Sequence, residues 1–249
     1  LAVVLLMATS LSAYAADAHL VPVDGTDYTQ ISQDEKQVSF SGGAREATEQ
    51  QVAESLLHTD NRALALELET ATTNSTRASW YQLDDMSSFV YYAQAVNYSC
   101  GPACVRMALR YLTGTQYSES TIRTGCGTTT SGTYLSNMKT YINNEQSVNS
   151  YATKFNASKT TMKNNLYSGI VSFDSPPIIG LKESTSAGWA FDLSAHFVTV
   201  YSVKSDKSEV AIADPWAGYV SSTSSYKWYD KSTDDVYTAY SAVNCGYMY

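Results

Sequence analysis

Apolar residues recur at helical spacing after Pro102. They occupy positions i, i+3, i+4 and i+7, which places them on one face of a helix; these residues are Cys104, Met107, Ala108 and Tyr111. Pro102 suits the first turn of that helix, because its φ angle is already helical and its missing N–H costs nothing there. Gly114 is typical of the position after the last helical turn. The pattern predicts a helix that begins at or just after Cys100 and ends near Gly114.

A strand pattern follows much later in the chain. Residues 196–203 are rich in β-branched and aromatic side chains, residues 204–208 are polar, and residues 209–216 are mostly apolar. This order predicts a β-hairpin. With the turn centred near Ser205–Asp206, paired residue numbers sum to about 411, so His196 faces roughly residue 215. Asp214 then falls beside His196.

The rest of the pattern predicts helices first and strands afterwards. Helices are predicted over residues 118–124, 132–143 and 160–168, a first strand over 176–181, and further strands over 225–229 and 236–240. Helices followed by an antiparallel sheet are the order of an α+β fold. One more helix is predicted upstream, over residues 44–68.

Cys100 would stand at the N-terminus of its helix, where unpaired N–H groups stabilise a negative charge. A thiol in that position can serve as a nucleophile, although a buried structural role is the simpler interpretation of a single cysteine. The presence of His196 and Asp214 favours the interpretation of Cys100 as a nucleophile. A cysteine, a histidine and a carboxylate that orients the imidazole form the nucleophile–base–orienter arrangement of acyl transfer. Spacing along the chain does not show that the hairpin lies near Cys100, so the arrangement of these three residues depends on the fold.

Three sequence blocks resemble one known enzyme family. They are Gln94 to Ala103, Ala195 to Val200, and Ile212 to Pro215. Over about residues 88–220 they resemble the papain-fold cysteine peptidases of the bacteriocin-processing (double-glycine) peptidase-like family. That family's pattern is a Gln upstream of Cys-Gly-Pro-Ala on a helix, then a His that opens a strand and Asp-Pro that closes the next. The resemblance implies a papain-like α+β fold, in which a helical half carries the nucleophile and packs on an antiparallel sheet.

The same resemblance implies roles for four residues. Cys100 is implied as the nucleophile, His196 as the general base and Asp214 as the acid that orients it. Gln94 is implied as the side-chain donor of the oxyanion hole, beside the backbone N–H of Cys100. The residues themselves leave a second use open for Gln94, as an amide that only fixes the loop before the helix.

The implied function is the hydrolysis of peptide bonds in a peptide or protein substrate. Papain-fold amidases and peptidyl transferases, which act on cell-wall or other amide bonds, use the same kinds of residue and remain an alternative. A non-catalytic peptide-binding surface module is a second alternative. Catalytic residues alone do not define the class of substrate.

The chain divides into three predicted parts. Residues 1–16 contain an apolar run and the small residues Ala13-Tyr14-Ala15, which predicts a signal peptide, truncated at its start, and a secreted or cell-surface protein. Residues 17–80 are rich in acidic side chains and are predicted to be a partly helical propeptide or linker. Residues 81–249 are the predicted peptidase domain. No later segment offers the roughly 20 apolar residues of a spanning helix.

A glycine pair, Gly42-Gly43, lies in the acidic segment. It would suit the double-glycine specificity of the family's processing members, which suggests self-cleavage. A Gly-Gly pair is more often simply a turn.

Composition argues against several other partners. The pI is near 4.8 and there is no basic run, so nucleic acid is not an expected partner. There is no glycine-rich phosphate loop. Cys100 and Cys104 have no second cysteine pair or histidine cluster of the kind that holds zinc. We expect no cofactor and no metal, and the sequence carries no indication of oligomeric state.

Four cysteines are present, and export would allow a disulfide. If Cys100 stays a free thiol and Cys104 is a small core residue, the remaining pair is Cys126 and Cys245. A Cys126–Cys245 bridge is therefore the prediction.

Overall fold

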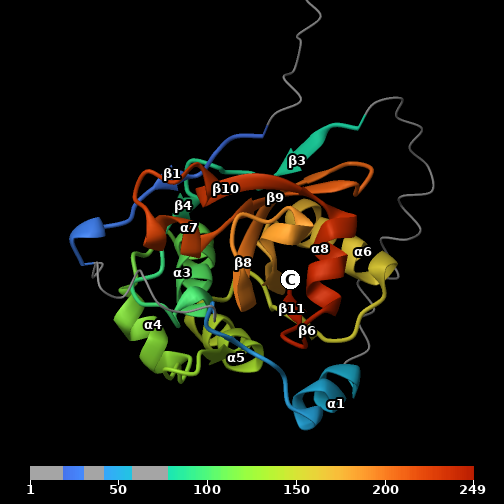
Figure 1. The fold of residues 1–249 in the computed structure, drawn as a ribbon, viewed down its shortest axis with the longest axis horizontal. Coiled ribbons are helices and arrows are strands. Elements are labelled where there is room, and N and C mark those ends of the chain that lie inside the picture. The colour runs from blue at the N-terminus through green and yellow to red at the C-terminus, as the bar shows by residue number, and fades with distance from the viewer. Residues whose placement is uncertain (1–18, 31–41, 58–77) are drawn as a thin grey trace, which may run out of the picture.

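The computed structural model describes residues 19–30, 42–57 and 78–249 (Figure 1). The predicted signal peptide over residues 1–16 lies outside them. The centre of the fold is an antiparallel sheet in the order β10, β9, β8, β7, β11, β6, and β3 pairs with the C-terminal end of β8. The strands are β3 (Trp80–Gln82), β6 (Thr153–Lys154), β7 (Ile178–Glu183), β8 (Leu193–Lys204), β9 (Glu209–Ala213), β10 (Trp228–Ser232) and β11 (Tyr247–Met248).

Two short parallel pairs tie upstream segments to this domain. β1 (Val23–Asp24) pairs with β4 (Val90–Tyr91), and β2 (Ala44–Arg45) pairs with β5 (Thr133–Tyr134). Short 3₁₀ turns cover Tyr28–Gln30, Thr185–Ala187 and Ser225–Lys227. Both parallel pairs involve the acidic segment, so parts of it are integrated into the fold.

Helices flank the sheet on two sides (Figure 1). At the left of that view lie α3 (Cys100–Thr113), α4 (Glu119–Gly125) and α5 (Leu135–Glu145), and at the right lie α6 (Lys159–Val171) and α8 (Thr233–Ser241). The short α7 (Pro215–Val220) follows β9, and α1 (Glu49–Leu57) lies at the bottom. Among the described residues no helix has both the length and the apolar character needed to cross a membrane. The predicted α+β order is confirmed.

α3 packs against β8 and has the predicted limits. Its apolar face is completely buried at Cys104, Met107 and Ala108. Gly114 follows the helix with a φ of 68°, in the left-handed region, and its N–H bonds the carbonyl of Arg110. Glycine adopts this conformation without the clash that a Cβ would cause. At its other end the helix begins with Cys100 as its first residue.

β8 and β9 form the predicted hairpin. Thr199 pairs with Ala213 and Val200 with Ile212, within one position of the predicted register, and a bulge follows between Val200 and Ser202. β10 joins β9 and extends the sheet near the predicted place. The pairing keeps the start of β8 and the end of β9 side by side, which the site requires.

The prediction of a strand over residues 236–240 is wrong. These residues lie in α8, where Ser232 caps the helix by accepting a hydrogen bond from the N–H of Asp235 at 3.1 Å. The buried apolar residues of that helix, Val236, Ala239 and Tyr240, recur at helical spacing. The β-branched and aromatic content favoured a strand, but the cap and the acidic first turn stabilise a helix.

Two predicted helices begin later than expected. Ala44–Arg45 is a strand, and α1 begins after a capping box in which the N–H of Thr48 donates to Gln51 Oε1 (2.9 Å) and that of Gln51 to Thr48 Oγ1 (3.3 Å). Residues 58–68 of the predicted helix lie outside the described part of the chain. α5 begins at Leu135 rather than at residue 132, because residues 133–134 pair with β2.

The predicted Cys126–Cys245 bridge is wrong. All four cysteines are free and buried. Cys126 caps the end of α4, whereas the Cβ of Cys245 packs against Gly180 of β7. The prediction rested on elimination among cysteines, which carries no information about where each one lies.

Candidate active site

The start of α3 is fixed on the backbone of one residue of β8. The N–H of Phe197 donates to Cys100 Sγ at 3.3 Å, and Cys104 Sγ donates to the carbonyl of Phe197 at 3.3 Å. Residues four apart share a helix face, so both sulfurs reach the same strand. Burial raises the pKa of Cys104 well above its ordinary value, which keeps it a thiol donor. Cys100 is thus held with its sulfur as an acceptor.

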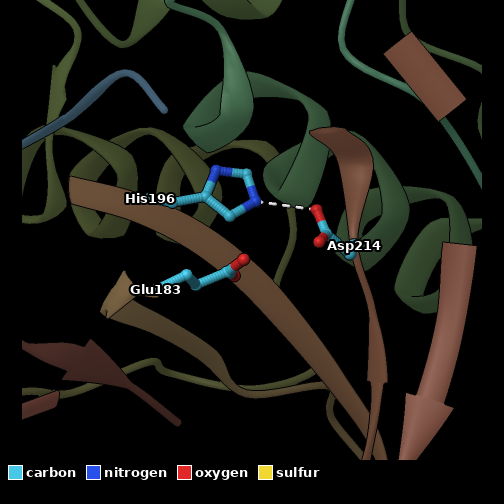
Figure 2. Close-up of side chains that lie close together, drawn as sticks. All are labelled: Glu183, His196 and Asp214. Atoms are coloured by element: carbon cyan, nitrogen blue, oxygen red, sulfur yellow. Dashed lines mark hydrogen bonds and ion pairs between the residues drawn. The ribbon is translucent and has the colours of Figure 1, made fainter. Parts of the chain in front are cut away.

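His196, one residue before Phe197, contacts Asp214 across the hairpin (Figure 2). The Nε2–Oδ1 distance is 2.7 Å. Asp214 is also the N-cap of α7, because its Oδ1 accepts the N–H of Trp216 at 2.8 Å and Pro215 occupies the first helical position. The Asp-Pro sequence therefore ends the strand, starts the helix and fixes the direction of the carboxylate.

The electrostatics at His196 favour the charged imidazole. Burial lowers its pKa. The charge of Asp214, the hydrogen bond to Asp214 and a hydrogen bond with Cys100 raise the pKa by more than burial lowers it, so the net pKa lies well above its ordinary value. Nε2 faces Asp214, and Nδ1 lies 3.5 Å from the carbonyl oxygen of Gly42. The arrangement therefore holds a charged imidazole beside the sulfur of Cys100.

Gln94 lies in the loop that leads into α3. Its Nε2 donates to the carbonyl of Val96 at 2.8 Å, the same oxygen that accepts from Ser99 N–H (3.2 Å) and Oγ (3.0 Å). One hydrogen of the amide therefore fixes the loop, as the second interpretation of the sequence expected, and the amide carries another hydrogen. The backbone N–H of Gln94 donates to the carbonyl of Pro215 at 3.1 Å, which ties this loop to the Asp214 turn. Its oxyanion role stays a prediction.

Glu119 holds the same loop, a contact that no sequence pattern predicts. Both carboxylate oxygens accept the N–H of Ala95, at 3.0 and 2.9 Å, from the first turn of α4. Burial raises the pKa of Glu119 to about 7, although Ser99, Ala95 and two arginines lower it. An acidic residue in a first helical turn is normally solvated, so only the packing of α4 against the loop shows this contact.

Glu183 brings a second carboxyl group to His196, beside that of Asp214 (Figure 2). It ends β7, is 2% exposed, and neither of its oxygens has a hydrogen-bond partner among the described residues. Burial, together with the charge of Asp214, raises its pKa to about 8, although the charges of His196 and Lys231 act in the opposite direction. Sequence reasoning missed Glu183, because a charged residue at a strand end is usually exposed.

The same three residues are the candidate metal ligands within the described ranges. One ligand atom from each of Glu183, His196 and Asp214 lies within 4.8 Å of the others. His196 Nε2 and Asp214 Oδ1 are hydrogen-bonded to each other at 2.7 Å. A metal between them would have to replace that bond, so the geometry fits a histidine–carboxylate pair better than a metal centre.

All four residues predicted from the sequence are completely buried. The side chains of Cys100, His196, Asp214 and Gln94 are each 0% exposed. Cys100, His196 and Asp214 form one connected group, and Gln94 lies in the loop that precedes it. The ring centre of Trp216 lies 6.4 Å from that of His196, in an edge-on arrangement. The four residues are closed to solvent.

One family model matches the chain. The family model described as "Peptidase C39 family" matches residues 88–227. A search of curated proteins finds no match. Among solved structures, a double glycine motif protease from an AMS/PCAT transporter, in complex with the leader peptide, is 16% identical with a TM-score of 0.42, over 63% of this chain and 86% of that chain. The peptidase domain of Streptococcus ComA, a bi-functional ABC transporter of a quorum-sensing pathway, is 18% identical with a TM-score of 0.43, over 64% of this chain and 94% of that one.

Proposed function

The chain belongs to the peptidase C39 family, and on that premise we propose that it is an exported cysteine peptidase that hydrolyses peptide bonds. Membership confirms the family resemblance seen in the sequence and the papain-like α+β fold. The proposal goes further in assigning roles. Cys100 is the nucleophile, His196 the general base, Asp214 the orienting acid and Gln94 a donor to the oxyanion.

One observation carries this proposal. Residues far apart in the sequence form a continuous chain of contacts, from Cys100 to His196 and from His196 Nε2 to Asp214 Oδ1 at 2.7 Å. The two ends of this chain are fixed from a second side, Cys100 by the N–H of Phe197 and Asp214 by the N–H of Trp216. Such orientation of nucleophile, base and acid is what covalent acyl transfer requires.

The proposed reaction uses two half-reactions. The sulfur of Cys100 attacks the peptide carbonyl carbon, and the carbonyl oxygen becomes an oxyanion that accepts from the N–H of Cys100 and the second amide hydrogen of Gln94. His196 gives its proton to the departing amine, which leaves a thioester on Cys100. His196 then takes a proton from water, the hydroxide attacks the thioester, and the acid product leaves while the thiolate and imidazolium re-form.

Export is the part of the proposal that rests on the sequence. The apolar run in residues 1–16 and the small residues Ala13-Tyr14-Ala15 support a secretory signal. The N-terminus of the protein recovered from culture medium tests it: we expect a cut after Ala15 or close to it. Cell-bound protein that still carries residues 1–16 would overturn the proposal of export.

Turnover of peptides tests the catalytic proposal. A peptide library incubated with the full chain, or with a variant of it in which the buried site is opened, should yield defined fragments by mass spectrometry, and Cys100→Ala should abolish them. Cys126→Ala is the matched control, because it removes another buried thiol and keeps the backbone N–H that caps α4. Fragments that persist in Cys100→Ala would refute the nucleophile. Peptide bound but uncut by every form would favour the non-catalytic binding module.

A further inference from the structure

A short upstream segment covers the buried site. We name residues 42–47 the strap; Gly42, Gly43 and Ala44 in it are buried. In Figure 1 it runs, in blue, from beside the lower end of α3 to α1, and in Figure 2 its end lies near the ring of His196. The four residues of the candidate site are closed to solvent in the same structure.

The glycine pair lies directly against the catalytic groups. The carbonyl oxygen of Gly42 is 3.5 Å from His196 Nδ1, and a Cβ added at Gly42 would come within 2.5 Å of His196 Cβ and 2.8 Å of the Ala195 carbonyl oxygen. A Cβ at Gly43 would come within 2.4 Å of the Tyr98 backbone, and its φ of +88° also disfavours other residues. The strap approaches the site more closely than any residue with a side chain could.

The strap binds the helical half through its backbone. The N–H of Thr133 donates to the carbonyl of Gly43 at 2.8 Å, and β2 continues in parallel along β5. The guanidinium of Arg45 lies 3.8 Å from the ring centre of Tyr134, and its Nη2 donates to the hydroxyl of that tyrosine at 2.5 Å. Gly132 makes room on the other side, since a Cβ there would lie 2.0 Å from the Gly43 oxygen.

The far end of the strap binds near the sheet. The N–H of Ala47 donates to the carbonyl of Asn244 at 2.6 Å, just before β11, and Asn244 Nδ2 donates to the carbonyl of Ala47 at 3.4 Å. α1 follows and is held to α5 by a hydrogen bond from Gln51 Nε2 to Ser136 Oγ at 2.6 Å. The strap thus bridges the helical half and the sheet across the site.

We propose that the strap is an inhibitor in the same chain, which occupies the place of the peptide substrate and must leave before turnover. This inference rests on the proposed peptidase function. Neither glycine carbonyl is free to enter an oxyanion hole, because that of Gly43 accepts from Thr133 and that of Gly42 faces His196. The strap is therefore bound in a geometry that blocks the nucleophile without presenting a bond for cleavage.

The accessibility of Cys100 tests the strap without relying on peptidase activity. Iodoacetamide alkylation of the full chain is followed by peptide mass spectrometry, with Cys104, Cys126 and Cys245 as internal standards. Gly42→Ala places a methyl group against the side chain of His196 and the carbonyl of Ala195, and Gly43→Ala places one against the backbone of Tyr98. We therefore expect both to open the strap and speed alkylation of Cys100 by roughly tenfold or more. Gly127→Ala is the matched control: it also adds a methyl at a positive φ, but its nearest neighbour is 3.4 Å away.

A synthetic peptide of residues 42–57 extends the test. Added in excess to the Gly43→Ala variant, it should slow Cys100 alkylation toward the wild-type rate, and the same peptide carrying Gly43→Ala should not. Equal alkylation of wild type and both strap variants would overturn the proposal. A Cys100-dependent cut within residues 42–47, seen in the intact mass of the full chain, would overturn it too, because the strap would then be a substrate.

The strap and the peptidase function can fail separately. Faster alkylation of the strap variants with no cleavage of any peptide would support the inhibitory role of the strap and refute the peptidase function. Peptide cleavage by the wild-type chain at the same rate as by the strap variants would support the peptidase function and refute the inhibitory role of the strap.

Discussion

Glu183→Gln should make the protein more stable, and increasingly so as the pH rises. The ordinary pKa of a glutamate is 4.5, and burial raises that of Glu183 to about 8. Between these values the unfolded chain releases the proton while the folded protein keeps it, so the free energy of unfolding falls as the pH rises. Below pH 4.5 both states are protonated, and above about pH 8 both are ionised. The amide has no proton to lose over this range.

The pKa values set the size of this effect. One pKa unit corresponds to about 1.4 kcal/mol, so between pH 4.5 and pH 7 the wild type should lose about 3 kcal/mol relative to Glu183→Gln. The other groups that face Glu183, namely Asp214, His196, Lys231 and Tyr229, are present in both proteins. Their own titration therefore largely cancels in the difference.

Urea unfolding at pH 5, 6, 7 and 8 measures that difference, provided that the slope m is the same in both proteins. Glu54→Gln is the control, because Glu54 is exposed on α1 and should leave the wild-type pH dependence unchanged. Parallel curves for wild type and Glu183→Gln would refute the reasoning, since Glu183 would then be ionised in the folded protein at neutral pH.

Two further predictions concern the reaction and use the Gly43→Ala background, in which the site is expected to be open. Asp214→Asn should lower kcat by about 10³–10⁴ with little change in KM, because the imidazole loses the partner that fixes its tautomer; a steady-state assay that finds kcat within a factor of a few of the parent would contradict this role. Gln94→Ala should lower kcat by about 10²–10³ while the alkylation rate of Cys100 stays unchanged. A parallel fall in alkylation would instead assign Gln94 to holding the loop through Val96.

Local sequence pattern was enough to predict the elements that carry the candidate residues. The helical period after Pro102 and the two strand-like runs on either side of Ser205–Asp206 each depend on neighbours in the chain, and both elements are present. The contact of His196 with Asp214 followed from the register of one hairpin. Joining the hairpin to Cys100 needed the family resemblance, because that contact spans the whole domain.

Contacts that depend on packing between distant segments could not be predicted. Glu183 and Glu119 look like ordinary surface acids in the sequence, and their burial becomes visible only when β7 and α4 are in place. The strap, residues 42–47, binds Thr133 and Asn244, and no sequence pattern links these three segments. At residues 236–240 the failure was local: β propensity was outweighed by a cap and by burial on a helical face.

The most direct test of the central claim is covalent labelling by a peptide that carries a thiol-reactive group. In the Gly43→Ala chain, the account predicts a single adduct on Cys100, identified by peptide mass spectrometry, and a labelling rate that falls by orders of magnitude when His196→Ala removes the base. The same probe should leave Cys104, Cys126 and Cys245 unmodified, because all three are buried. Labelling that favours another cysteine, or that proceeds equally fast without His196, would contradict the account.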